Sequence, residues 1–128
     1  MIEVREKSAF YVQLAAQRPA VWPVAKGVAF VSRREHQDWG IALHIEGRVL
    51  SPEQLRDALQ RRFSQAERFN RYFLFLDVQH DVIVWRAVND GPSSAVILDD
   101  IRRHQLLLAG LDRLSEELSS ADGPHSRY

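Results

Sequence analysis

Two pairs of short apolar segments alternate with amphipathic helical segments, and this alternation is the strongest constraint on the fold. Residues 24–31 and 39–45 form the first pair, and residues 72–76 and 82–88 form the second. Within each pair only a few polar residues separate the two segments, a pattern typical of antiparallel hairpins. The sequence therefore predicts a sheet built from two hairpins.

Three further segments have helical periodicity. The first spans residues 3–18. The second begins at Ser51, which can cap a helix together with Gln54, and continues for about five turns of apolar positions spaced three and four apart. The third is leucine-rich, begins between residues 94 and 100, and ends at Leu118. These segments supply the apolar faces that would cover one side of the sheet.

The resulting order, α-β-β-α-β-β-α, predicts an α+β fold with an antiparallel sheet and three helices. With 128 residues, 45% of them hydrophobic and 27% charged, the chain has the composition of one ordinary globular domain. We expect this domain to span residues 1–118 and a flexible tail to span residues 119–128. The continuously apolar run at 72–76 predicts that the second hairpin forms the centre of the sheet and the first lies nearer its edge.

Several classes of protein are disfavoured by composition. The chain has no cysteine, which excludes a disulfide framework, a thiol nucleophile and any thiolate metal site. Seventeen basic residues balance seventeen acidic ones, so no overall field attracts nucleic acid or anionic lipid. The charged N-terminus differs from a signal peptide, and no stretch has the roughly 18 apolar residues of a membrane helix. We expect a cytoplasmic protein with no membrane partner.

The search for catalytic chemistry finds no recognised motif. The five histidines are scattered, and none has a metal-ligand spacing. His80 and Asp81 form a dipeptide that occurs in metal sites, but they lie in a predicted hairpin turn, where polar residues are expected. We therefore expect no catalytic residue, no metal site, no cofactor and no enzymatic activity. An enzyme without recognisable motifs is retained as a third possibility.

Arginine accounts for fifteen of the seventeen basic residues and occurs in three adjacent pairs. The pairs are at residues 33–34, 61–62 and 102–103, in three different predicted elements with acidic residues nearby. Arginine is enriched at protein interfaces, which favours solvated faces or interface rims over a nucleic-acid surface. A nucleic-acid-associated regulator is the alternative function, and it would show steeply salt-dependent binding to DNA.

Large apolar side chains are concentrated around the first hairpin. A single sheet has difficulty burying all of them, and exposed apolar patches mark association surfaces. We therefore predict a homodimer or heterodimer, and a partner segment bound at the first hairpin. The predicted contact residues are Trp22, Val28, Phe30, Trp39 and Ile41, with Arg33 and Arg34 at the polar rim.

The order of elements and the pattern of apolar residues in the C-terminal half resemble those of the class I chaperones of bacterial type III secretion. The resemblance is strongest where residues 72–78 and 82–88 lead into Leu98-Asp-Asp-Ile and the leucine-rich helix. It implies a homodimer that holds an extended segment of a secreted effector or regulatory protein without ATP. Those chaperones are typically acidic, whereas this chain is neutral and arginine-rich, which leaves room for a chaperone-like regulator of the same fold.

Overall fold

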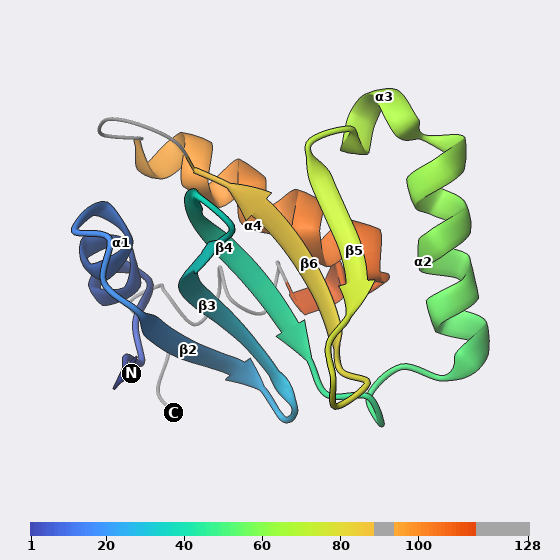
Figure 1. The fold of residues 1–128 in the computed structure, drawn as a ribbon, viewed down its shortest axis with the longest axis horizontal. Helices are drawn as coiled ribbons and strands as arrows, with labels where there is room; N and C mark the ends of the chain where they lie inside the picture. The colour runs from blue at the N-terminus through green and yellow to red at the C-terminus, as the bar shows by residue number, and fades with distance from the viewer. Residues whose placement is uncertain (89–93, 115–128) are drawn as a thin grey trace.

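The computed structural model describes residues 1–88 and 94–114, and six strands in it form one sheet (Figure 1). The strand order is β1-β2-β3-β4-β6-β5, and all neighbours are antiparallel except β1 and β2. The predicted α+β fold is confirmed. The elements are β1 (Ile2–Glu3), α1 (Lys7–Ala15), β2 (Ala20–Ala25), β3 (Val28–Glu35), β4 (Asp38–Ile45), α2 (Pro52–Ser64), α3 (Ala66–Phe69), β5 (Tyr72–Leu76), β6 (Val82–Ala87) and α4 (Ala95–Ala109).

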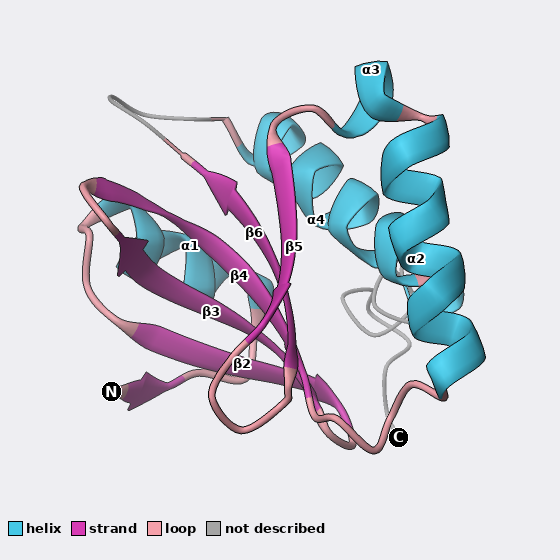
Figure 2. Cartoon of the chain, turned by 45° about the vertical axis from the view of Figure 1, so that its right-hand side comes forward, coloured by secondary structure: helices cyan, strands magenta, loops and turns pink. Residues whose placement is uncertain are grey.

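The helices form a layer on one face of the sheet. In Figure 2, α1 and α4 lie behind the strands, and α2 packs against α4 beyond the β5 end of the sheet. Of the helices that the structure describes, none covers the opposite face (Figures 1 and 2). We call this opposite face the open face.

The helices differ in detail from the sequence prediction. The capping box is confirmed, since the amide of Gln54 donates to Ser51 Oγ and the amide of Ser51 donates to Gln54 Oε1. The helix it starts stops at Ser64 because Gln65 leaves the helical conformation, and α3 follows as a separate turn. The first helix is shorter than predicted because Ile2–Glu3 form a strand beside β2.

The N-terminal half of the sheet contains two more strands than predicted, β1 and the separate β2. The segment 24–31 was interpreted as one strand, but the chain reverses at Gly27, whose φ of 76° suits glycine, between β2 and β3. The polar stretch 32–38 was interpreted as a loop, yet β3 continues to Glu35 and the turn is confined to His36 and Gln37. Pairing with β4 continues residue by residue through Glu35 and Asp38, which keeps this polar stretch in the strand.

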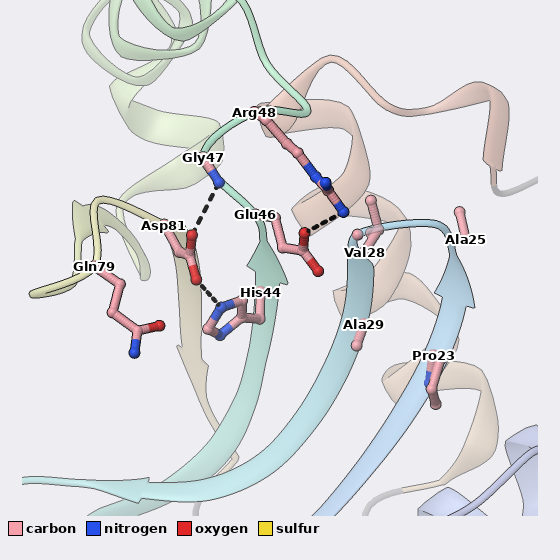
Figure 3. A pocket seen from close by; sticks show the side chains of 11 residues that line it. Pro23, Ala25, Val28, Ala29, His44, Glu46, Gly47, Arg48, Gln79 and Asp81 are labelled. Atoms are coloured by element: carbon pink, nitrogen blue, oxygen red, sulfur yellow. Dashed lines mark hydrogen bonds and ion pairs between the residues drawn. The ribbon is translucent and has the colours of Figure 1, made fainter.

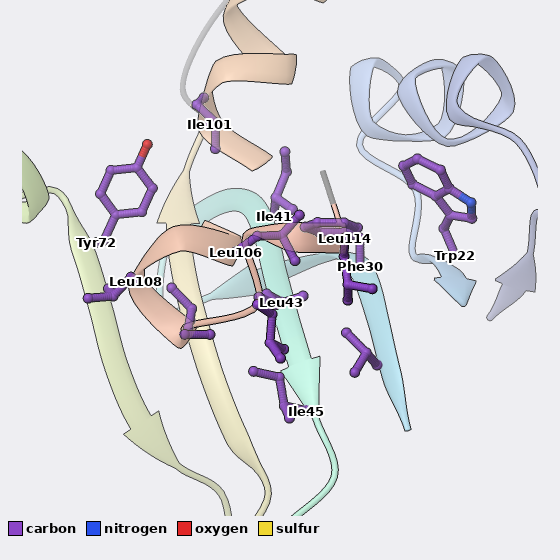
Figure 4. Packing of buried hydrophobic residues seen from close by; sticks show 14 of the residues in the cluster. Trp22, Phe30, Ile41, Leu43, Ile45, Tyr72, Ile101, Leu106, Leu108 and Leu114 are labelled. Carbon is purple, nitrogen blue, oxygen red and sulfur yellow. The ribbon is translucent and has the colours of Figure 1, made fainter. Parts of the chain in front are cut away.

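The core lies between the sheet and the layer of α1 and α4 (Figure 4). One side of β4 supplies Trp39, Ile41, Leu43 and Ile45, all of them buried in this cluster. Gln105 of α4 is also fully buried, and its amide donates to two backbone carbonyls, one on β4 and one on β6. These bonds fix α4 against the middle of the sheet.

The predicted placement of the two hairpins is wrong. The strand β4 pairs with both β3 and β6, so the first hairpin occupies the middle of the sheet. The run Tyr72–Leu76 forms β5, which pairs only with β6 and is therefore an edge strand. A short strand, β1, covers part of the outer edge of β2, whereas no described residue pairs with the outer edge of β5.

The last helix begins at Ala95, with the Ser94 side chain accepting a hydrogen bond from the amide of Ile97. It ends at Gly110, whose φ is 77°, and Leu111 and Leu114 remain buried beyond it. The predicted boundary at residue 118 and the predicted tail at 119–128 lie outside the described residues. Within residues 1–88 and 94–114, each helix is too short or too polar to traverse a bilayer.

Candidate functional site

The five apolar residues predicted to contact a partner lie in the core. Trp22, Val28, Phe30 and Ile41 are at most 4% exposed, and Trp39 is 9% exposed. The expectation of a surplus apolar surface at the first hairpin is wrong, because α1 and α4 cover that face. Direct contact of these residues with a partner stays a prediction, and it requires the core to open.

Two of these core residues flank a buried arginine. The guanidinium of Arg102 lies 5.0 Å from the ring centroid of Trp22 and 5.5 Å from that of Phe30. It also pairs with Asp99 at 3.1 Å and donates to the hydroxyl of Tyr11. This network joins α1 to α4, and burial raises the pKa of the Tyr11 phenol. The role of this network is consistent with packing of α1 against α4.

The arginine pairs are engaged within the molecule. On β3, Arg33 forms an ion pair with Glu35, and the exposed Arg34 lies over the ring of Trp39 at 5.6 Å. The other two pairs bind backbone carbonyls or carboxylates: Arg61 donates to Leu108 O, Arg62 to Tyr72 O, Arg102 to Asp99 and Arg103 to Asp100. Because these groups already have partners, the structure provides little support for the nucleic-acid alternative.

Exposed apolar side chains gather instead on β5. Phe73 is 54% exposed, Phe75 is 36% exposed and Leu76 is 47% exposed. The strand Tyr72–Leu76 contains no charged residue and no proline, although natural edge strands usually carry such residues to prevent unwanted pairing. An apolar strand with one free edge is a site where another chain can pair.

The open face continues the apolar surface from β5 across the sheet. Through the strand register, Phe73 lies opposite Trp85, Trp85 opposite Ala42, and Ala42 opposite Val31. Ile83 lies in the next row, opposite Phe75. Val31, Ala42, Ile83 and Trp85 form a second buried cluster, separate from the core under the helices. The open face therefore carries an apolar strip, in which Phe73 and Phe75 are exposed and the remaining members are buried among their neighbours.

A pocket of about 380 Å³ lies where this strip meets the tip of the β3–β4 hairpin. Phe73, Phe75 and Trp85 supply its apolar lining, and Glu35, His36 and Asp38 supply its polar lining. We call it the Trp85 pocket. Its position next to the free edge of β5 lets one partner segment occupy both.

A larger groove of about 780 Å³ lies on the open face near the β2–β3 turn (Figure 3). On its floor, His44 Nε2 lies 2.8 Å from Asp81 Oδ2, and the amide of Gly47 donates to Asp81 Oδ1. The hydrogen bond with His44, followed by that from Gly47, lowers the pKa of the Asp81 carboxyl below its usual value. These bonds join the β5–β6 hairpin to the end of β4.

The same region contains a group of possible metal ligands. Side-chain atoms of His44, Asp77 and Asp81 lie within 4.8 Å of one another. Asp77 Oδ1 already accepts hydrogen bonds from the amides of Gln79 and Asp81, as expected for an aspartate in a turn. The hairpin therefore accounts for this arrangement without a metal ion. In the sequence, Asp81 is adjacent to His80 and the two suggest a metal dipeptide. The contact of Asp81 with His44 is not indicated by the sequence.

Sequence reasoning also missed the β5 surface. The indication was present in the continuous apolar run of Tyr72–Leu76, which is typical of a strand covered on both faces. That pattern was interpreted as a sheet centre. In the structure the run lies at an edge, where no described residue covers one face.

Comparison with known families gives one match. The model of a family described as HrpV-like matches residues 2–113 of the chain. The matched span contains every strand and helix described above, from β1 through α4. No curated protein and no solved structure matches the chain.

Proposed function

The chain belongs to the HrpV-like family, which is associated with the regulation of type III secretion, and on that premise we propose that it is a non-enzymatic regulator that holds an extended segment of a protein partner along β5. The observation that carries this proposal is the free, apolar edge of β5 with its exposed Phe73, Phe75 and Leu76. The partner is a secreted effector or another regulatory protein, and the complex forms in the cytoplasm.

Strand addition gives this edge a physical means of binding. A partner segment would pair its backbone with β5, and alternate side chains would reach the open face. Phe73 and Phe75 point to that face, where they are continuous with Trp85 and Ile83 through the strand register. The backbone bonds provide affinity for any extended chain, and the side-chain contacts select among sequences.

This mode of binding is the chaperone-like component of the proposal. Capture of an extended segment requires no nucleotide, metal or cofactor. In the larger groove of the open face, the carboxylate of Asp81 interacts with His44 and accepts a hydrogen bond from the amide of Gly47. These bonds stabilise the hairpin that carries the end of β5.

The proposal includes association of the chain as a homodimer or as a heterodimer with its partner. A second exposed apolar pair supports this part: Leu59 is 43% exposed and Phe63 is 81% exposed, one turn apart on α2.

The test is co-expression of the chain with the proteins encoded by neighbouring genes, followed by affinity purification. We expect wild type to retain one of these proteins and the variant Phe73→Lys/Phe75→Lys to lose it at least tenfold, since charged side chains at an edge oppose pairing. Val12→Lys on α1, also at an exposed apolar position, is the matched control and should behave as wild type. Full retention by the β5 variant would contradict the proposal.

A further inference from the structure

The Trp85 pocket has a fixed apolar floor. Trp85 is only 5% exposed although it lies on the open face. Its ring packs against Gly40 so closely that a Cβ atom at Gly40 would lie 2.8 Å from Trp85 Cη2. The absence of a side chain at Gly40 therefore sets the position of the indole ring. Phe73 and Phe75 of β5 form the neighbouring apolar wall.

The rim of the pocket is acidic. Glu35 and Asp38 lie opposite each other at the end of the β3–β4 hairpin, on the side of the sheet that faces the pocket. Glu35 is neutralised by its ion pair with Arg33. Asp38 is exposed, and its carboxylate has no hydrogen bond or ion pair with any residue in 1–88 or 94–114. The unpaired carboxylate of Asp38 therefore lies beside the apolar part of the Trp85 pocket.

The volume of the pocket indicates what it can hold. At about 380 Å³ it lies near the lower limit of small-molecule sites, roughly 300–1,000 Å³. That space accommodates one large apolar side chain together with part of a second. In an extended segment paired with β5, residues two apart project to the same face, so two such side chains point together over the open face.

We propose that the Trp85 pocket selects partner segments in which a large apolar residue is followed or preceded, two positions away, by arginine or lysine. The apolar side chain fills the hollow between Trp85 and Phe75, and the cation pairs with Asp38. This inference rests on the proposed function, because the pocket receives these side chains only from a segment paired with β5. It adds a sequence preference that strand pairing alone does not provide.

The test uses synthetic nonapeptides of the form Ser-Val-Ser-Phe-Ser-Xaa-Ser-Val-Ser, with Xaa as Arg, Gln or Glu, titrated into isotope-labelled protein and followed by NMR. An exposed ion pair is worth little, so we expect the Arg peptide to bind about threefold more tightly than the Gln peptide and about tenfold more tightly than the Glu peptide. The preference should shrink at high salt. Asp38→Asn should abolish it, while Asp57→Asn, an exposed aspartate on α2, should leave it unchanged.

The two proposals fail in different ways. Equal binding of all three peptides, with shifts at the amides of β5, would overturn the charge preference and leave strand pairing intact. A preference that persists in Asp38→Asn would likewise overturn the assignment to this pocket. Absence of shifts in β5 with every peptide, combined with retention of the co-expressed partner by the β5 lysine variant, would overturn both.

Discussion

Replacement of Trp39 by alanine distinguishes the core assigned by the structure from the binding surface predicted from sequence. Trp39 is 9% exposed, and its indole donates a 2.9 Å hydrogen bond to the hydroxyl of Ser32, which is fully buried. Truncating a buried tryptophan costs about 3–5 kcal/mol. Leaving the Ser32 hydroxyl without its partner adds about 1 kcal/mol. We therefore expect Trp39→Ala to lower the free energy of unfolding by about 4–6 kcal/mol.

This loss is a large part of the total stability of a domain, about 5–15 kcal/mol. An unfolding entropy of roughly 2.1 cal/mol/K per residue gives about 0.27 kcal/mol per kelvin for 128 residues. The expected decrease in Tm is therefore about 15–22 °C by calorimetry. Trp39→Phe, which keeps most of the ring and loses the indole N–H, should cost about 1–2 kcal/mol.

The control is Val12→Ala, because that apolar side chain is 58% exposed and lies outside both proposed association surfaces. It should change the free energy of unfolding by about 0.5 kcal/mol or less. A Trp39→Ala protein that keeps its Tm within a few degrees and loses its partner would refute the reasoning. Trp39 would then be a contact residue, as the sequence alone suggested.

Three further predictions concern pH, packing and association. The pKa of Asp81 is held below its usual value, near 3.8. Its contribution to stability is therefore present above that value and is lost as the pH decreases through the lower folded pKa. In Asp81→Asn the free energy of unfolding, measured by urea titration, should therefore decrease less between about pH 5 and 2 than it does in wild type. Gly40→Ala should destabilise the domain by about 3 kcal/mol, because a Cβ there would lie 2.8 Å from both Ala87 Cα and the ring of Trp85; a Tm unchanged from wild type would show that the ring is free to move. Phe63→Glu should turn a homodimer into a monomer in light scattering at tens of micromolar, where roughly −7 kcal/mol of association is detectable; dissociation by β5 substitutions instead would place the dimer interface on β5.

Local patterns predicted the elements that depend on local chemistry. The capping box at Ser51 and Gln54 predicted the start of α2. The polar residues at 79–81 predicted the β5–β6 hairpin. In each example, neighbours in sequence supply the interactions that decide the structure.

The order of strands depends on contacts between distant residues, and the sequence pattern did not determine it. A continuous apolar run predicts a strand covered on both faces, which is why Tyr72–Leu76 was assigned to the sheet centre. At the sheet edge, the same run has one face on the core and another on the open face. The face of β5 that no described residue covers is the feature that indicates a partner. It can be identified only when the strand order is known.

The expected exposure of apolar side chains at the first hairpin was wrong for a related reason. Composition showed that large apolar side chains cluster near the first hairpin, but it could not show that α1 and α4 both pack over them. Trp22 and Phe30 pack with Arg102 from α4, which lies more than seventy residues further along the chain. No local pattern anticipates an arginine from the last helix inside that cluster.

Hydrogen exchange of the β5 amides, with and without the co-expressed partner, tests the central claim most directly. In the free protein no described strand lies beside the outward-facing amides of Tyr72–Leu76, which should therefore exchange rapidly. The account predicts that the partner slows exchange in β5 at least tenfold and leaves exchange in the central strands β3 and β4 nearly unchanged. Unchanged exchange in β5, with new protection or opening confined to the first hairpin, would contradict it.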